Sequence, residues 1–258
     1  MFMEERQREI ARIIQENGGV TIAELAQRYG VSEESLRRDL RALERQGLCQ
    51  RTHGGAIRPQ QVNIKPPDDR DFERMPVLDN YREIARAAAA RIRENDVVYL
   101  TGGSFGYIML RFLPRDFRFT LVVNSVDVAK QLRGWENIDV YIVGGRMRPN
   151  GTAVDSLATA FVSGMHFDMC FLTGAGVTAK FGLSNGTDET ATFQRAVMKN
   201  SRRRILLTPG EKVGRDAFIR VCPVEEFHEI ITDWIADEEQ LALIREAGVE
   251  VSAVVEPK

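Results

Sequence analysis

Residues 31–55 read VSEESLRRDLRALERQGLCQRTHGG, and this stretch decides how the first part of the chain folds. Ser32 stands at an N-cap position, and the two glutamates that follow it fall in a first helical turn, where the helix dipole favours acids. Three leucines recur at helical spacing and form one apolar face: Leu36, Leu40 and Leu43. Gly47 stands where such a helix ends. The stretch therefore predicts a capped helix that packs through its leucines.

The face of this helix opposite the leucines is basic. Arg38, Arg41 and Arg45 share it with Glu34, and Arg37 lies at its flank. The first turns of such a helix suit base edges in the major groove of DNA, and its later arginines suit phosphates. Arginines are also common on surface helices, so the stripe alone would indicate a solvated face.

The segments on either side complete a winged helix-turn-helix pattern. Upstream, residues 5–17 carry an isoleucine stripe, and Thr21 and Glu24 have capping-box spacing for a second helix that stops near Gly30. Downstream, residues 48–57 form a short basic strand, a Gly-Gly turn and a second strand, which predicts a hairpin wing. Two capped helices, a short turn and a basic wing together favour DNA binding over a solvated face.

Positive charge is concentrated in this region. The whole chain carries 35 Lys and Arg against 37 Asp and Glu, a net charge of -2 that does not indicate a nucleic-acid partner. Residues 35–58 carry six arginines against two acids, a net charge of +4, which is the local basic edge that DNA contact requires. The residues predicted to contact DNA are Thr21, Ser32, Glu34, Ser35, Arg37, Arg38, Arg41, Arg45, Arg51 and His53.

The rest of the chain has an α/β pattern in which short apolar runs alternate with helical segments. The candidate strands are 97–100, 119–123, 140–143, 169–172, 205–207, 230–231 and 249–255. This order predicts a mostly parallel, doubly wound sheet. Four prolines and dense charge over residues 58–76 predict a linker. We therefore expect a DNA-binding domain at 1–58, a linker at 59–76, and an effector-sensing and oligomerisation domain at 77–258.

Glycines and small hydroxyl side chains follow four of these strands, at the edge where open α/β sheets bind ligands. Gly103 and Ser104 precede a helix, whose first N–H groups suit an anion, although βα turns need glycine for ordinary reasons as well. Lys212 suits a phosphate or carboxylate, and Asp188 and Glu189 suit sugar hydroxyls, but each is also an ordinary surface charge. The predicted effector-binding residues are Gly103, Ser104, Asn124, Ser125, Gly144, Gly145, Arg146, Gly174, Gly176, Asp188, Glu189 and Lys212.

The stretch VSEESLRRDLRALERQGLCQRTHGGAI resembles the DeoR family of bacterial transcription regulators, whose signature is a VS-x-x-T-[IL]-RRDL helix followed by an R-x-HGG wing. Ser35 stands at the threonine of that signature. The resemblance extends to the second domain, which is similar to DeoR-type sensor domains that share the fold of ribose-5-phosphate isomerase. It implies a sugar-phosphate effector at the strand ends, where matching positions are retained at Gly103, Ser104, Asn124, Ser125, Gly144, Gly145 and Lys212.

Five positions depart from the family pattern. Thr101 stands where the family has Asp, Phe105 and Gly106 replace two threonines, and Pro209 and Glu211 replace Asp and Ser before the lysine. The loss of two carboxylates and two hydroxyls removes hydrogen-bonding capacity for a polyol, and the new phenyl ring adds apolar surface. These departures predict a different or more apolar ligand, or weaker binding.

Three functions compete at this stage. The first is a DNA-binding regulator, expected to repress a carbohydrate-related operon under the control of a small effector such as a sugar phosphate, a sugar or a polyol. The second is a sugar-phosphate isomerase, which needs a carboxylate base. Two expected carboxylates are replaced by Thr101 and Pro209 and only Asp188 or Glu189 remains for that role, so we expect no enzyme and no catalytic residues. The third is a constitutive DNA-binding protein with a degenerate sensor.

Composition narrows the remaining possibilities. Cys49, Cys170 and Cys222 are few and far apart, so we expect three buried apolar side chains rather than a disulfide framework or a zinc site. No apolar run has the length of a membrane span and no secretion signal opens the chain, so we expect a cytoplasmic protein without metal or cofactor. One DNA-binding head offers little surface, so we expect a homo-oligomer, a dimer or higher, on double-stranded operator DNA.

Overall fold

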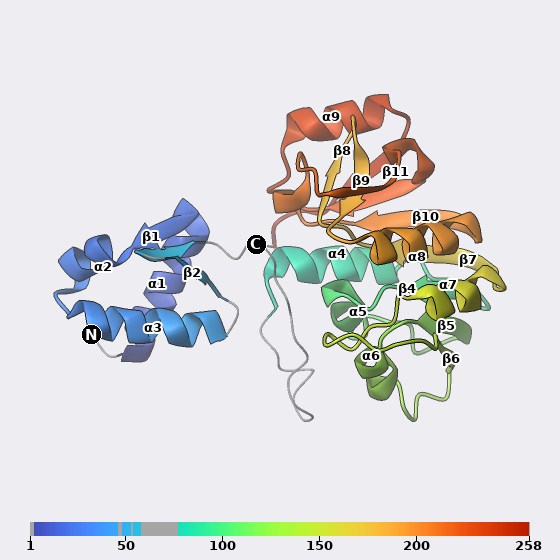
Figure 1. Cartoon of the computed structure of the whole chain (residues 1–258), viewed down its shortest axis with the longest axis horizontal. Coiled ribbons are helices and arrows are strands. Elements are labelled where there is room, and N and C mark those ends of the chain that lie inside the picture. Colours follow the sequence, from blue (N-terminus) through green and yellow to red (C-terminus); the bar gives the residue numbers. More distant parts are fainter. Residues whose placement is uncertain (1–2, 46–47, 53, 58–76, 258) are drawn as a thin grey trace. The chain divides into compact units, whose positions relative to one another are not determined.

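A computed structural model of the chain describes residues 3–45, 48–52, 54–57 and 77–257 (Figure 1). The chain divides into two compact units, residues 1–64 and 65–258. The predicted linker at 59–76 and the boundary at residue 58 lie outside the described residues, and so does His53.

The N-terminal unit is a winged helix-turn-helix, as predicted. Its elements are α1 (Met3–Asn17), β1 (Gly19–Thr21), α2 (Ile22–Tyr29), α3 (Glu33–Arg45), β2 (Gln50–Thr52) and β3 (Gly55–Ile57). The two wing strands pair antiparallel, and β1, which the sequence analysis did not predict, adds to the outer edge of β3.

Local signals set the ends of the two central helices. Thr21 and Glu24 form the complete capping box of α2, and the N–H of Gly30 donates to Ala26 O at the end of that helix. Gly30 has φ 63°, a left-handed conformation that glycine adopts without steric cost, so the chain can turn sharply into α3. Ser32 Oγ accepts a hydrogen bond from the N–H of Ser35 at 3.3 Å, which confirms the predicted cap of α3.

The core of this unit is formed by the predicted apolar stripes. Its buried members are Ile10, Ile14, Ile22, Leu25, Leu36, Leu40, Leu43, Cys49 and Ala56. Since the leucine face of α3 is turned into this core, its arginine face points to solvent.

The C-terminal unit is built on a seven-stranded sheet in which every pairing is parallel. The strand order is β13-β12-β10-β7-β4-β5-β6. These strands are β4 (Val97–Leu100), β5 (Phe119–Val123), β6 (Ile138–Ile142), β7 (Phe167–Leu172), β10 (Ser201–Leu207), β12 (Glu229–Thr232) and β13 (Glu250–Ala253). All seven coincide with predicted strands, so the doubly wound α/β fold is confirmed.

Helices cover both faces of the sheet (Figure 1). One face packs on α7 (Ser156–Ser163), α8 (Asp188–Lys199) and α9 (Glu238–Glu246), whose apolar residues share a core with alternate strand residues such as Tyr99 and Val122. The other face carries α4 (Asp79–Ala89), α5 (Ser104–Met109) and α6 (Val126–Gln131). Every strand is buried between helices except at the edges, which explains its nearly continuous apolar sequence.

The sequence analysis missed a second, three-stranded sheet in this unit. It is antiparallel, in the order β11-β9-β8, and consists of β8 (Gly176–Thr178), β9 (Gly182–Asn185) and β11 (Ile219–Cys222). Short 3-10 turns at Gly210–Lys212 and Val224–Glu226 complete the unit. All three cysteines are buried and unpaired, as predicted. No helix among the described residues is long and apolar enough to cross a membrane.

Candidate DNA-binding face and effector site

The outward face of α3 presents Arg37, Arg38 and Arg41 to solvent, and two of these arginines are held by acids of the same helix. Arg37 forms an ion pair with Glu33 at 2.9 Å, and Arg41 forms one with Glu34 at 2.8 Å. All four side chains are about half exposed or more, so these pairs contribute little to stability and break readily when a phosphate competes.

Arg38 differs from its neighbours. It is exposed, and no hydrogen bond or ion pair ties its guanidinium to any residue that the structure describes. It can therefore form a bidentate contact with a base or a phosphate without first breaking another interaction. Arg45 closes the same helix, and its side chain lies outside the described part of the chain.

The remaining predicted DNA contacts lie at the starts of two helices and in the wing. Thr21, Ser32 and Ser35 lie at the starts of α2 and α3, where helix N-termini commonly meet phosphates. In the wing, the backbone N–H of Arg51 donates to Glu44 at 3.0 Å and its Nε donates to the same carboxylate at 2.8 Å. These hydrogen bonds lower the pKa of Glu44, so the acid stays ionised and fixes the wing to α3.

At the strand ends of the C-terminal unit, several predicted effector residues shape the loops themselves. Asn124 is buried: its Oδ1 accepts from the N–H of Gly102 at 2.9 Å, and its Nδ2 donates to Ala153 O at 3.0 Å. Ser125 is fully buried and caps α6. Gly174 packs closely against the side chain of Leu183, and Gly176 packs closely against the backbone of Arg215. A Cβ atom at either glycine would clash with these atoms. Gly103 is the N-cap of α5, and Ser104 is the first residue of that helix.

An aromatic pair occupies the space beside the first of these loops. The rings of Tyr81, from α4, and Phe105, from α5, stack at 5.1 Å between centroids, and both side chains are buried. Tyr81 also donates to Glu211 at 2.9 Å. Burial raises the pKa of Tyr81, with the negative charge of Glu211 acting in the same direction, so the phenol remains a donor. Three residues that sequence analysis treated separately, or did not single out, thus form one cluster.

At Gly106, one of the positions that depart from the family pattern, the structure leaves no room for a side chain. A Cβ at this position would lie 2.1 Å from the carbonyl oxygen of Thr101, so no larger residue fits. The close approach seats α5 directly against the end of β4.

Lys212 lies beyond the end of β10, next to Glu211. Burial lowers the pKa of its ammonium group, and the charge of Glu211 only partly offsets that effect. Within the described part of the chain, no hydrogen bond or ion pair engages its Nζ atom. A largely buried ammonium without a direct partner is unfavourable in the folded state, and an anion placed against it would relieve this.

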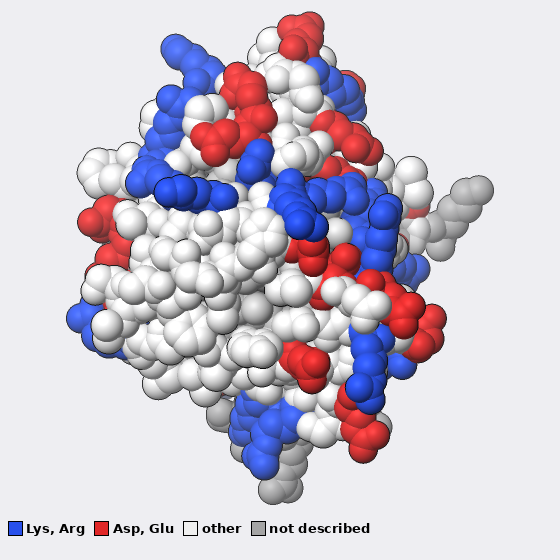
Figure 2. Space-filling view, turned by 90° about the vertical axis from the view of Figure 1, so that its right-hand side faces the viewer, with Lys and Arg blue, Asp and Glu red and all other residues white. Residues whose placement is uncertain are grey.

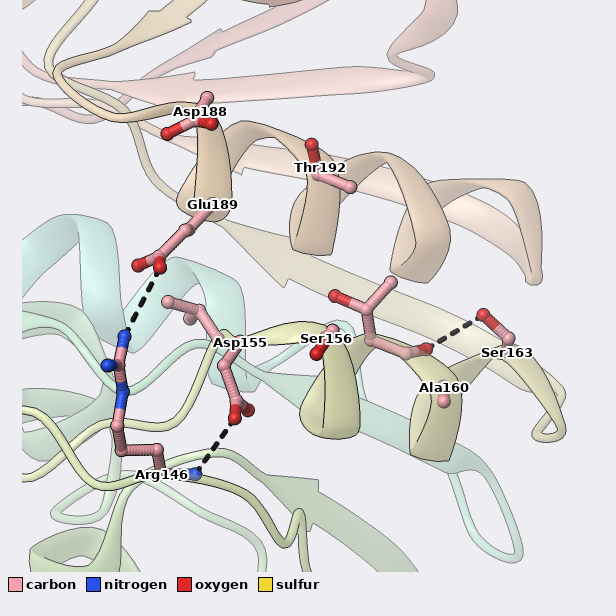
Figure 3. Close-up of a pocket in the computed structure, with 10 residues that line it drawn as sticks. Arg146, Asp155, Ser156, Ala160, Ser163, Asp188, Glu189 and Thr192 are labelled. Atoms are coloured by element: carbon pink, nitrogen blue, oxygen red, sulfur yellow. Dashed lines mark hydrogen bonds and ion pairs between the residues drawn. The ribbon is translucent and has the colours of Figure 1, made fainter.

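A separate open hollow of about 720 Å³ lies between α7 and α8 (Figure 3). Arg146, Asp188 and Glu189, all predicted effector residues, line it together with Asp155. Arg146 pairs with Glu189 at 3.3 Å, and its backbone N–H donates to Asp155 at 3.2 Å. Glu189 is also bound by Arg148, a residue that the sequence analysis overlooked. Gly144 and Gly145 form the loop that leads into the hollow.

The structure therefore divides the predicted effector residues into a buried loop framework, the Lys212 region and this hollow. Hydrogen bonds from backbone N–H groups, chiefly that of Ala158, lower the pKa of Asp155 and keep it as the cap of α7. Glu189 forms ion pairs with both Arg146 and Arg148. No group of three or more His, Cys, Asp and Glu among the described residues has the arrangement of a metal site.

Comparison with known families decides the identity of both units. The DeoR-like helix-turn-helix domain matches residues 6–62, and the DeoR C terminal sensor domain matches residues 78–234. The chain belongs to the DeoR family of transcriptional regulators. This DeoR-type protein is a DNA-binding regulator and not an enzyme.

Relatives of this DeoR-type regulator align over nearly the whole chain. The HTH-type transcriptional regulator GlpR of Haloferax volcanii is 29% identical and aligns with 97% of this chain and 98% of its own. The lactose phosphotransferase system repressor of Staphylococcus aureus is 28% identical over 95% of this chain and 97% of its own. Among solved structures, ribose 5-phosphate isomerase from Plasmodium falciparum matches 51% of this chain and 52% of its own, with 12% identity and a TM-score of 0.34.

Proposed function

We propose that this DeoR-type regulator represses a carbohydrate-related operon and that a small anionic effector bound near Lys212 controls it. The operator-binding face is the outward surface of α3 with the wing, centred on Arg38. The relative from Staphylococcus aureus is named a repressor of a lactose phosphotransferase system, which supports repression and a carbohydrate link. We expect the protein to regulate transcription in the cytoplasm and to act as a homo-oligomer on double-stranded DNA.

The observation that carries the effector proposal is the state of Lys212. Its burial-lowered pKa and the lack of a direct partner for it among the described residues favour an anion as ligand. Ser104 and the start of α5 would present a hydroxyl and backbone N–H groups to the same ligand. A sugar or polyol that carries a phosphate or carboxylate has this combination of charge and hydroxyls.

The route from effector to DNA begins at α4, the first helix after the predicted linker. Two successive residues near the start of α4 contact strand-end loops: Asn80 donates to Asp233 at 2.9 Å and Tyr81 donates to Glu211 at 2.9 Å. An anion drawn to Lys212 would compete with Glu211 for that ammonium and so alter the Tyr81 contact. Movement at the start of α4 would then change how the DNA-binding heads are presented, shifting the population of DNA-competent arrangements.

Ligand-dependent melting of the full-length protein tests this proposal. A panel of sugars, sugar phosphates, sugar acids and polyols should contain a compound that raises the melting temperature in proportion to the logarithm of its concentration. The shift should vanish in Lys212→Ala and Ser104→Ala and persist in Lys180→Ala, which removes an exposed lysine of the same unit. A shift that survives in Lys212→Ala would overturn the proposed site.

The stacked pair of Tyr81 and Phe105 favours a second candidate function, a constitutive DNA-binding protein. The two rings fill space beside the first loop, and their side chains are almost completely buried. If no compound in the panel shifts the melting temperature while operator binding is intact, this second function is the better description.

A further inference from the structure

The edge strand β6 exposes three consecutive apolar residues. Val140, Tyr141 and Ile142 are 37%, 52% and 45% exposed. Among the described strands β6 pairs only with β5, so its outer N–H and C=O groups have no strand partner. Exposed apolar edge strands promote association, and monomeric proteins usually protect them with charges, prolines or bulges. β6 carries a single charged residue, Asp139.

The exposed side chains lie on both faces of the sheet edge. Tyr141 is in register with Val122 of β5, which points to the core under α7 and α8, so Tyr141 lies on that face. Val140 and Ile142 alternate with it and lie on the face that carries α6. A partner that covered only one face of the sheet would leave the other apolar side chains in water.

Helix α7 extends the apolar surface beside β6. It contains no charged residue, and its outward side chains include Leu157 at 67% exposure and Phe161 at 41%. Met147, which follows β6 in the loop leading towards α7, is 62% exposed. Figure 2, which views the side on which α7 and β6 lie in Figure 1, shows a broad area without Lys, Arg, Asp or Glu. A helix without charges on its outer face is typical of a buried position.

We propose that a second copy of this chain docks on this surface, with β6 pairing antiparallel to the β6 of the partner about a two-fold axis. A continued sheet satisfies the outer N–H and C=O groups of β6 and covers apolar side chains on both faces of the edge at once. Antiparallel self-pairing is isologous, so both copies use the same surface and assembly closes at two. Such an interface joins α7 to the α7 of the partner across the axis.

The choice of a second copy, and not another protein, rests in one respect on the proposed function. A single winged helix-turn-helix offers too little surface for tight and specific operator binding, and a two-fold axis supplies a second head for a second half-site. The composition of the surface agrees, since apolar and uncharged interfaces are typical of permanent homodimers.

Sedimentation of the full-length protein without DNA or effector tests the interface. We expect a dimer whose dissociation constant rises roughly tenfold or more in Tyr141→Glu and in Leu157→Glu. Leu243→Glu, which places the same charge on the exposed face of α9, should leave the dimer unchanged. A monomeric wild type, or a dimer that both substitutions leave intact, would overturn the proposal. Because the experiment contains no DNA, either of these results would overturn the dimer interface without bearing on operator binding by α3.

Oxidative cross-linking tests the antiparallel pairing directly. A two-fold axis perpendicular to a continued sheet places one residue of β6 opposite its own copy, within about 5.5 Å between Cα atoms, close enough for a disulfide. Four variants, each with a single cysteine introduced at one of positions 139–142, should therefore be compared. One variant should form a cross-linked dimer in high yield, and the variants at neighbouring positions should form little. The native cysteines are buried and should not contribute. If the protein is a dimer but none of the four variants forms a cross-link, this mode of pairing is contradicted.

Discussion

Two residues carry the two proposed activities, and their surroundings differ. Arg38 keeps a guanidinium in solvent without a partner among the described residues, while the arginines beside it are paired. Lys212 keeps an ammonium largely away from water, where its charged form is disfavoured. A largely buried charge such as that of Lys212 lowers stability, and such a cost is common where a group serves function.

Replacing Lys212 with methionine should therefore stabilise the ligand-free protein, by about 0.5–2 kcal/mol. Methionine keeps the length and the apolar stem of lysine and removes the unfavourable charge. Because the pKa is lower in the folded state than in the unfolded state, the protonated group opposes folding, and this opposition fades as pH rises through the lowered pKa. The gain in the free energy of unfolding, measured by urea denaturation, should be largest near neutral pH and shrink in alkali. A variant less stable than wild type would show that Lys212 serves folding.

The sequence located these residues but not their neighbours. Arg38 followed from the leucine period of its helix, and Lys212 from a family position. The cluster of Tyr81, Phe105 and Glu211 joins three segments that are far apart along the chain, and no local pattern reports such a contact. Arg148 was overlooked because its partner, Glu189, lies on another element.

At the scale of elements, α1 and α3 are joined by a buried ion pair. Asp39 is 1% exposed and lies on the leucine side of α3. Arg6 Nε contacts it at 2.7 Å, and Gln7 donates to its other oxygen at 2.9 Å. The sequence contained a signal for this pair, since Asp39 interrupts the apolar face three residues after Leu36.

Removing the arginine should destabilise the N-terminal unit strongly. Arg6→Ala leaves the buried Asp39 carboxylate with one amide donor, that of Gln7, among the described residues, which costs about 3–5 kcal/mol for a pair of this kind. Hydrogen exchange of the α3 amides in the full chain should accelerate accordingly. The double variant Arg6→Leu with Asp39→Leu should recover much of the loss, because no charge is left unpaired. If Arg6→Ala leaves exchange unchanged, the pair does not hold α3 in place.

Some helices and strands have a strong apolar pattern in the sequence and could be predicted from it, and others do not. The five inner strands of the large sheet are largely buried between helices, so each appears as an apolar run in the sequence, whereas the edge strands β6 and β13 are more exposed. The strands β8 and β9 are short and contain glycine, and β1 has three residues, so their pairing depends on partners distant in sequence.

At the scale of the whole molecule, the pH dependence of stability should be shaped by Glu229. Its side chain is fully buried, and burial alone would raise its pKa. Hydrogen bonds from Arg91 and Ser252 and the charge of Arg203 outweigh burial and lower the pKa overall. The ionised carboxylate links the segment that follows α4, through Arg91, to strands β10, β12 and β13.

A lowered pKa means that this contribution is present above the ordinary value of 4.5 and is lost as pH falls through the lowered value. Glu229→Gln should thus reduce the free energy of unfolding near neutral pH, and the difference from wild type should narrow in acid. Denaturant titrations from about pH 7 to pH 3 measure this difference. A gap that stays constant over that range would show that the titration of Glu229 does not contribute to acid lability.

The central claim is that α3 reads an operator sequence, and selection of DNA from a random pool by the full-length protein tests it most directly. The selected site should then be bound by wild type and by Arg202→Ala, an exposed arginine of the other unit, with equal affinity. Arg38→Ala should lose about 1–3 kcal/mol at fixed salt and discriminate less well at one base position. A pool without an enriched sequence, or an Arg38→Ala variant that binds the selected site as tightly as wild type, would contradict it.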